Sequence, residues 1–247
     1  MMMHLCTIQS GAVRSMIECF KDMLNDCNLI FNETGVSLVT LDTSRTSLVD
    51  MKLDAQNFEE YTCDGTVVCG INMSNTWKIL KSVSTADILR LSVTSREYMT
   101  IEIESEAKKT KSSFQLKLLD INDNRITVPE IQTSSVTTMP STDLQRLVRD
   151  MANIGSDLLI ERYDKVLKLH CEGDFANQET CVECADEVAG HTKGVFSIKF
   201  LNVFTKCTSM CSNVMIMQED QKFLILQYDV AMLGTVRFFL AAKALED

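Results

Sequence analysis

Apolar residues recur at helical spacing between positions 139 and 155, which predicts an amphipathic helix. The apolar stripe consists of Leu144, Leu147, Val148 and Met151. Ser141 is placed to cap the helix, and Asp143 suits the positive end of the helix dipole. Arg146 and Arg149 lie three positions apart, so they share a second face that is basic rather than apolar.

Three further segments predict helices of the same two-faced design, with an apolar stripe and two basic residues at helical spacing. These segments are 10–24, 74–83 and 197–206. Their basic pairs are Arg14 with Lys21, Lys78 with Lys81, and Lys199 with Lys206. A single such pair is typical of an ordinary solvated helix face. Four matched pairs indicate one shared basic surface.

Short runs with the alternation of β-strands fill the rest of the chain. In the first half they are 28–32, 36–41, 46–53, 66–71, 88–94, 98–104 and 113–118. In the second half they are 158–162, 166–171, 180–185, 196–199, 214–218, 223–229 and 236–240. The order of elements in the second half repeats that in the first. The sequence therefore predicts an α+β chain with two topologically similar domains, 1–118 and 134–247, joined by a connecting loop at 119–133.

The charge distribution is uneven along this acidic chain. The formal net charge is -10 and the sequence pI is about 4.9, which alone would argue against a nucleic-acid partner. The four predicted helices, however, carry eight Lys or Arg and four Asp or Glu, so they sum to +4 and the remainder to -14. If the four basic faces converge in space, this acidic protein has a basic surface.

No motif for enzyme chemistry stands out. The chain has no GxxxxGK[ST], GxGxxG, GxSxG or HExxH pattern and only three histidines. Zinc ligands are conceivable among Cys181, Cys184, His170 and His191, with Cys207 and Cys211 nearby, but the spacing is loose. Alternation places Cys181 and Cys184 on opposite faces of a strand, so we expect packing and no metal. Without a signal sequence or a long apolar run, we expect a soluble intracellular protein with reduced cysteines.

One polar loop and one pair of apolar residues each allow two interpretations. Thr43, Ser44 and Arg45 form a polar loop that is either a phosphate grip or a solvated turn. Ile126 and Val128 lie on one side of the extended connecting loop. They either cover the surface of their own domain or offer part of a groove to an incoming peptide.

Five stretches, in order, resemble those of the proliferating cell nuclear antigen family, the eukaryotic sliding DNA clamps, over essentially the whole chain. They are GVSLVTLDTSRTSLVDMKL (35–53), LKLLDINDNRITVPE (116–130), MPSTDLQRLVRDMANIGSD (139–157), FLNVFTKCT (200–208) and GTVRFFLAAK (234–243). The resemblance implies a non-enzymatic homotrimeric ring without cofactors, in which helices line the hole and antiparallel sheets lie outside. The residues that would face the DNA phosphates are Arg14, Lys21, Lys78, Lys81, Arg146, Arg149, Lys199 and Lys206.

The resemblance also implies a groove for partner peptides with aliphatic and aromatic anchors. The matching residues are Leu41, Arg45, Leu48, Ile126, Val128, Pro129, Phe223, Phe239, Leu240 and Ala241. This chain departs from the family at three positions nearby. Arg45 stands where histidine is usual, Thr127 where glycine is common and Ala242 where proline is usual, which bears on the motif that the groove prefers.

Ring closure in the family joins edge strands of neighbouring subunits. The counterparts here are Phe114 and Leu116 in one strand, and Cys181, Val182 and Cys184 in another. The expected partners are duplex DNA, a DNA polymerase, a clamp loader, other peptide-bearing proteins and further copies of the chain, with no membrane. The nucleus, or the replication compartment of a large DNA virus, is the expected location.

Three alternatives stay open. One is a subunit of a heterotrimeric checkpoint-type clamp, and another is a non-ring processivity factor that acts as a monomer or dimer. The third is a metal-dependent or thiol enzyme that uses the cysteines.

Overall fold

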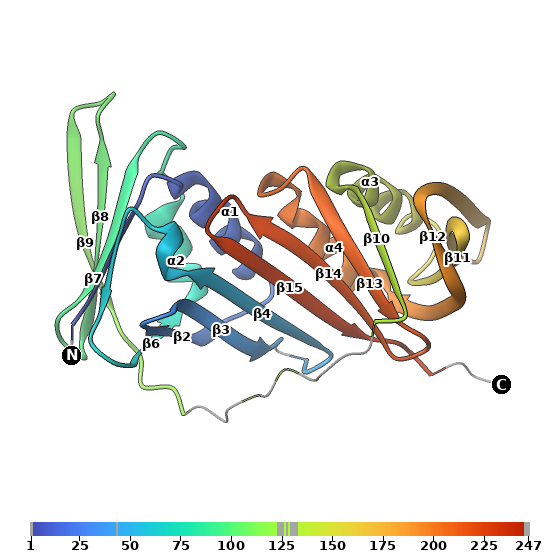
Figure 1. Ribbon diagram of the computed structural model, residues 1–247, viewed down its shortest axis with the longest axis horizontal. Coiled ribbons are helices and arrows are strands. Elements are labelled where there is room, and N and C mark those ends of the chain that lie inside the picture. The colour runs from blue at the N-terminus through green and yellow to red at the C-terminus, as the bar shows by residue number, and fades with distance from the viewer. Residues whose placement is uncertain (1, 43, 123–125, 127, 129–132, 245–247) are drawn as a thin grey trace. The chain divides into compact units, whose positions relative to one another are not determined.

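The computed structural model describes residues 2–42, 44–122, 126, 128 and 133–244. The chain forms two compact units. Unit 1 comprises Met1–Thr43, Val49–Thr127 and Asp229–Val236, and unit 2 comprises Ser44–Leu48, Val128–Tyr228 and Arg237–Asp247. Figure 1 follows the chain through the elements of each unit.

Unit 1 contains a five-stranded antiparallel sheet in the order β5-β1-β7-β8-β9. Its strands are β1 (Met3–Thr7), β5 (Glu60–Cys63), β7 (Ile88–Val93), β8 (Tyr98–Ser105) and β9 (Thr110–Lys117). A second run of strands has the order β4-β3-β2-β6. It consists of β2 (Asp26–Asn32), β3 (Gly35–Leu41), β4 (Ser47–Asp54) and β6 (Val67–Asn72). Helices α1 (Ser10–Phe20) and α2 (Met73–Leu80) pack on each other, and a short 3-10 helix, η1, spans Ala55–Asn57.

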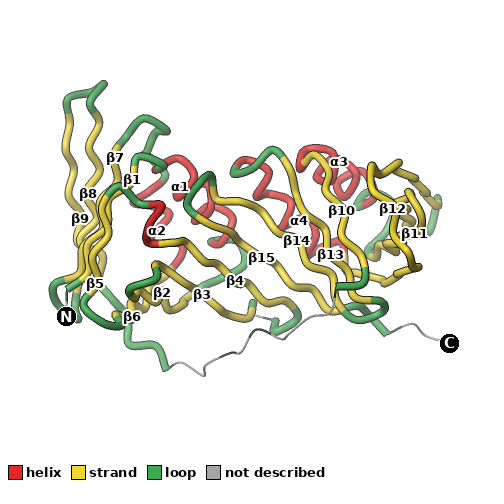
Figure 2. Tube along the Cα trace, in the orientation of Figure 1, coloured by secondary structure: helices red, strands yellow, loops and turns green. Residues whose placement is uncertain are grey.

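Unit 2 contains the strand run β10-β13-β14-β15, except for the residues of β14 and β15 within 229–236, and a separate ribbon made of β11 and β12. The strands are β10 (Ser135–Pro140), β11 (Asp157–Glu172), β12 (Asn177–Ser197), β13 (Asn213–Glu219), β14 (Phe223–Val230) and β15 (Gly234–Ala241). Helix α3 (Ser141–Met151) packs on α4 (Ile198–Phe204) and on the 3-10 helix η2 (Thr205–Ser209). Figure 2 shows the helices in red and the strands in yellow.

Each unit has an apolar core at the side chains that the alternation of its strands turns inward. In unit 1, Phe20, Phe31 and Leu38 are fully buried. In unit 2, the rings of Phe204 and Phe238 stack with centroids 4.9 Å apart. These aromatic side chains join α4 to β15, so packing rather than helix propensity stabilises the seven-residue α4.

The expected fold class is confirmed, and most predicted elements occur within two or three residues of their predicted ends. Three strands were missed: β1, β5 and β10. The predicted strand 196–199 is wrong from Ile198 onward, because Ile198 begins α4. Helix α1 ends at Phe20 rather than Leu24. The single helix predicted at 197–206 is instead α4 followed by η2.

The predicted cap of α3 is also wrong. Ser141 is the first helical residue rather than the cap, and its hydroxyl donates to the carbonyl of Cys211 at 2.6 Å. Ser10, the first residue of α1, makes the equivalent bond to the carbonyl of Asp87 at 2.7 Å. Both serines are fully buried. The two units thus fasten the start of their first helix in the same way, which supports the predicted repeat.

Candidate DNA-binding helices and protein-binding surfaces

The two basic residues predicted on the first helix are both partly engaged within unit 1. Arg14 is half-buried, and its Nη1 donates to the carbonyl of Val83 at 2.8 Å, just beyond α2. Lys21 follows α1, and its Nζ lies 5.1 Å from the centroid of the Trp77 ring on α2. A cation at that distance is attracted to the ring face. Arg14 and Lys21 therefore hold α1 against α2, whatever else they bind.

Lys78 and Lys81 are exposed on and immediately after α2. Lys78 Nζ donates to Asn75 Oδ1 at 3.2 Å. Asn75 in turn donates its backbone N–H to the side chain of Asn72, which caps the helix. The capped helix thus fixes the backbone positions of both lysines, while their charged ends remain in solvent.

In unit 2, the guanidinium of Arg146 lies between two carboxylates of its own helix. Its nitrogens are 3.8 Å from Asp143 and 3.8 Å from Asp150, and about half or more of each of these side chains is exposed. Exposed ion pairs of this kind contribute only about 0–1 kcal/mol. Arg146 can therefore exchange its carboxylates for phosphate oxygens at little cost. Arg149, in the last turn of α3, is exposed.

Lys199 lies on α4 and Lys206 on η2, and both side chains are exposed. Because α4 gives way to a 3-10 helix after Phe204, helical spacing does not relate these two lysines as predicted. Gln145 on α3 donates its amide to the carbonyl of Thr205 at 2.8 Å. This bond ties the end of α4 to α3 and so positions the segment that carries Lys206.

The residues expected to form the peptide groove differ in exposure. Leu48, Phe239 and Leu240 are buried, with Leu240 only 1% exposed, so the Leu240 side chain belongs to the core. Leu41, Ile126, Val128 and Phe223 are half-buried, and Arg45 and Ala241 are exposed. Pro129, Thr127 and Thr43 lie outside the described residues. The half-buried apolar side chains are those with surface available to a partner.

Two residues at which the chain departs from the resemblance, Arg45 and Ala242, have distinctive backbone features. Arg45 has a φ of 58°, in the left-handed region that non-glycine residues seldom adopt. The backbone N–H of Ala242 donates to the carbonyl of Lys222 at 2.7 Å, and that of Lys243 to Val195 at 2.8 Å. A proline at position 242 has no N–H and could not make the first bond. The alanine therefore secures the segment after β15 to unit 2.

The strands expected at the subunit interface both present a free edge. β9 is the last strand of its sheet, and Phe114 is 36% exposed whereas Leu116 is 7% exposed. In the described part of the chain, the first half of β12 pairs with β11 alone. There Cys181 is exposed, and Val182 and Cys184 are half-buried. Unpaired edges are templates for pairing with another chain.

Comparison with known proteins matches both halves of the chain. Residues 2–125 match the family model for the N-terminal domain of proliferating cell nuclear antigen, and residues 127–243 match the model for its C-terminal domain. The chain belongs to the proliferating cell nuclear antigen family. It is therefore a sliding clamp, and membership supports a role in DNA replication as a polymerase processivity factor rather than as an enzyme.

Two relatives cover almost the whole chain. A probable DNA polymerase sliding clamp 1 from Paramecium bursaria Chlorella virus 1 is 32% identical over 252 residues, which span 96% of this chain and 95% of the relative. The proliferating cell nuclear antigen of the fungus Chaetomium thermophilum is 29% identical over 251 residues, or 97% of each chain. The boundary between the two family matches falls inside the predicted connecting loop.

The cysteines of this clamp are all free thiols. Burial raises the pKa of the Cys27 and Cys69 thiols to about 12, from an ordinary value of 9.0. Burial also raises the pKa of Cys6, Cys63 and Cys171. Because the thiolate is the nucleophile, a raised pKa lowers the reactivity of these thiols at neutral pH, most of all that of the buried Cys27 and Cys69. Within the described residues, no three His, Cys, Asp or Glu side chains gather in a way that could hold a metal ion.

Unit 1 also contains a cleft of about 730 Å³ that no sequence pattern indicated. Its walls include the partly exposed Val68, Tyr98 and Leu119. The backbone of Leu119 crosses Gly70, where an added Cβ would lie 2.2 Å from the Leu119 carbonyl oxygen. That glycine allows the start of the connecting loop to lie directly on β6 and form one wall of the cleft.

Among the described helices, none is long and apolar enough to cross a membrane.

Proposed function

We propose that three copies of this chain form a closed ring that encircles duplex DNA without reading its sequence. The observation that supports this is the placement of exposed cations on or beside the helices of both units in a protein with a net charge of -10. These are Lys78, Lys81, Arg146, Arg149, Lys199 and Lys206. Phosphate contacts by such side chains hold DNA at any sequence, and they are weak enough individually to be exchanged as the ring slides.

The acidic remainder of the chain complements this arrangement. A surface of negative charge repels DNA over distances of about a Debye length. The favoured place for the duplex is then the surface that carries the basic helices. Retention would come from closure of the ring rather than from affinity, so interactions that are screened and short-lived are sufficient.

A DNA polymerase and other replication or repair proteins would bind through a short peptide. Leu41 and Ile126 in unit 1, and Val128 and Phe223 in unit 2, have half-buried side chains that each offer apolar surface to its aliphatic and aromatic anchors. A separate ATP-driven loader would open the ring, because the chain has no phosphate-binding loop of its own. The site of action would be wherever the DNA is copied, in a nucleus or a viral replication compartment.

Light scattering across a dilution series under reducing conditions tests the ring. A mass of three times 27.8 kDa that persists on dilution supports the homotrimer. A monomer at all concentrations contradicts it and favours a heterotrimeric clamp or a non-ring processivity factor. Retention of the trimer on circular DNA, with loss on cutting the circle, would then test encirclement directly.

A further inference from the structure

We propose that unit 1 contains a binding site for a small apolar ligand in its interior, between helices α1 and α2 and the strands of the unit. The ligand class is a guest of one or two apolar heavy atoms, of which xenon and short hydrocarbons are the simplest examples. The site lies inside one unit of one chain, so its existence does not depend on the proposed ring.

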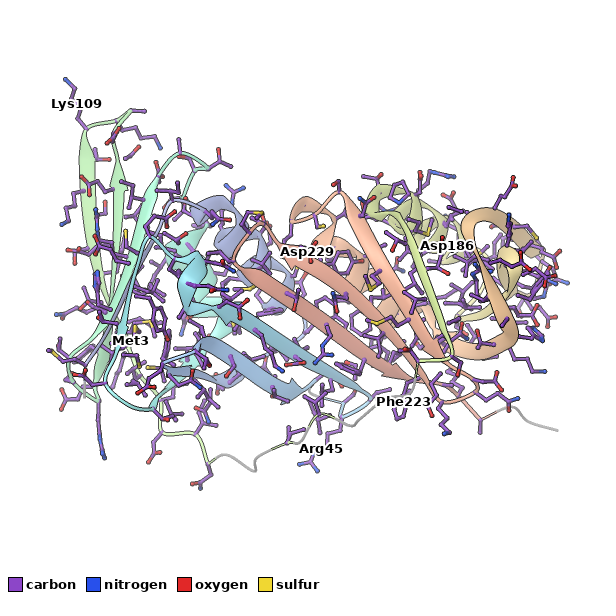
Figure 3. All side chains as sticks on the ribbon, in the orientation of Figure 1. Met3, Arg45, Lys109, Asp186, Phe223 and Asp229 are labelled. Carbon is purple, nitrogen blue, oxygen red and sulfur yellow. The ribbon has the colours of Figure 1, made fainter. Side chains whose placement is uncertain are left out.

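The site is an interior cavity of about 50 Å³ in the core of unit 1. Both helices and both groups of strands contribute to its wall, for example through Val13 on α1, Leu80 just before the end of the α2 segment, Leu89 on β7 and Phe31 on β2. None of these four side chains is more than 8% exposed. Figure 3 shows the side chains that fill the interior of this unit, with the buried Met3 of β1 labelled among them.

The wall of the cavity is apolar throughout. Among the described residues, no polar atom faces it. Two threonines belong to the wall, but their hydroxyl groups are engaged elsewhere. Thr76 Oγ1 donates to the carbonyl of Asn72 at 2.9 Å, and Thr7 Oγ1 accepts from the backbone N–H of Gln9 at 3.0 Å. A buried water needs about two to four polar partners, so an apolar guest meets no competition from water here.

The volume of the cavity limits the size of the guest. One water molecule occupies about 30 Å³ in the liquid, and an apolar cavity of about 150 Å³ takes up benzene or xenon. The cavity in unit 1, at about 50 Å³, lies between these values and nearer the first. It therefore admits one or two heavy atoms and excludes an aromatic ring. An empty space deprives the surrounding side chains of dispersion contacts, and a guest restores them.

Three methionines make the wall adaptable. They are Met16 on α1, Met51 on β4 and Met99 on β8, and each is at most 3% exposed. An unbranched thioether side chain has three rotatable bonds and can change its rotamer to suit a guest. Val36 and Ile71, which also line the cavity, are β-branched and stiffer. The methionines are therefore the side chains expected to move when the site is filled.

The cavity lies behind the two helices of unit 1 that carry basic residues. Val13, in its wall, directly precedes Arg14, and Leu80 directly precedes Lys81. A guest that binds the folded protein and not the unfolded chain stabilises the folded state. A small apolar ligand should therefore stabilise the packing of α1 and α2 in unit 1 without contacting the charged ends of these residues.

Xenon binding to the full chain, labelled with ¹³C at its methionine methyl groups, tests the site. The signals of Met16, Met51 and Met99 should shift over a series of xenon pressures and reach a plateau. Met151 is the internal control, because it is fully buried in unit 2 and does not line the cavity, so its signal should not shift. Replacing each methionine with leucine in turn assigns the signals.

A pair of matched variants tests the location. Val13→Ile adds one methylene to the α1 wall, and Val148→Ile adds the same group to α3, where Val148 is 1% exposed in unit 2. Val13→Ile should raise the midpoint of thermal unfolding by about 2 °C, because the methylene fills empty apolar space, and should abolish most of the xenon-induced shift. Val148→Ile should not raise the midpoint and should leave the xenon-induced shift intact, because it enters a packed core.

A saturable shift confined to the three cavity methionines, and lost in Val13→Ile alone, supports the site. The absence of a saturable shift at these methionines overturns it, as does a shift of equal size at Met151. A Val13→Ile variant that responds to xenon like the unmodified chain also overturns the location. If that variant folds poorly, the xenon series on the unmodified chain still decides, and it does so equally for a monomer or a ring.

Discussion

The Nε of Arg162 donates to Thr137 Oγ1 at 2.9 Å in the interior of unit 2, where Arg162 is only 1% exposed. Its other nitrogens donate to the backbone carbonyls of Tyr163, Asp164, Val166 and Asp186. Hydrogen bonds from a charged donor are roughly twice as strong as those between neutral groups, so these bonds offset part of the cost of burying the guanidinium. Arg162 therefore holds together the break in the β11–β12 ribbon and fastens that ribbon to β10.

Replacing Arg162 with methionine should destabilise unit 2 by about 3 kcal/mol, because it leaves several buried carbonyl groups and a hydroxyl without a donor. The midpoint of urea unfolding, followed by circular dichroism, would measure the change. Arg149→Met is the matched control, since Arg149 is exposed and should change stability by less than about 0.5 kcal/mol. Equal midpoints for the two variants would contradict the role given to Arg162.

The buried thiols predict a dependence of stability on pH. Folding raises the pKa of Cys27 and Cys69 to about 12 from 9.0. The neutral thiol is thus favoured in the folded state, so its contribution is fully present below about pH 9 and is lost as the pH rises toward 12. Unfolding midpoints measured at successive pH values should fall in that window, and a Cys27→Ala, Cys69→Ala variant should show a smaller fall.

The same burial should order the reactivity of the cysteines. Iodoacetamide at about pH 8 should label the partly exposed Cys211 and spare Cys27 and Cys69 until the protein unfolds. Mass spectrometry of digested protein would report the order. Labelling of Cys27 or Cys69 as fast as Cys211 in the folded protein would contradict the burial of these two thiols.

The sequence alone predicted the elements that have a clear period and missed those that do not. The stripe of Leu144, Leu147, Val148 and Met151 is buried as expected, because helical spacing fixes one face of α3. β1 and β10 were missed because each is a short run directly before a helix, and their pairing partners are distant in the chain. Local pattern carries no information about such partners.

The candidate site shows the same division. Spacing correctly placed Lys78, Arg146 and Arg149 on exposed helical surface, whereas Lys81 is exposed directly after the end of α2. Spacing could not reveal that Arg14 on α1 donates to the carbonyl of Val83, which follows α2. It also could not reveal that Leu240 is buried. The sequence pattern also gave no sign of the role of Arg162, because a single arginine in a polar stretch of a strand is usually a surface residue. Its burial depends on Thr137 and Asp186, which lie 25 and 24 positions away.

The basic helices predict a measurable response to salt. Replacing Lys78, Lys81, Arg146 and Arg149 with alanine should leave the oligomeric mass unchanged, because none of the four side chains is buried. If all four bind phosphates, the slope of log binding constant against log salt should become shallower by about 3 to 4, at about 0.9 for each phosphate that is no longer neutralised. Binding to a duplex of arbitrary sequence, followed by fluorescence anisotropy over a salt series, measures that slope.

Two further variants show which changes can and cannot serve as controls for the salt dependence of DNA binding. Lys52→Ala with Lys222→Ala removes exposed lysines outside the helices and should leave the slope unchanged. Arg14→Ala is unsuitable as a test of DNA binding alone, because it also removes the bond between α1 and the turn after α2. A slope that the fourfold variant does not alter would show that DNA meets another surface.

The connecting loop predicts a separable effect on partner binding. Ile126 and Val128 are half-buried, so each retains apolar surface that a peptide could cover. Replacing both with serine should weaken binding of a synthetic peptide with aliphatic and aromatic anchors by at least about tenfold, since each apolar side chain removed costs about 1 kcal/mol or more. Isothermal titration calorimetry on the trimer measures the affinity.

Val136→Ser, at a 42% exposed position on β10, is the control and should bind as before. The free energy of unfolding should stay within about 1 kcal/mol of that of the unmodified protein, because neither side chain belongs to a buried core. Peptide binding that survives both changes would place the groove on another part of the clamp, and the cleft beside Val68 and Tyr98 would become the next surface to test.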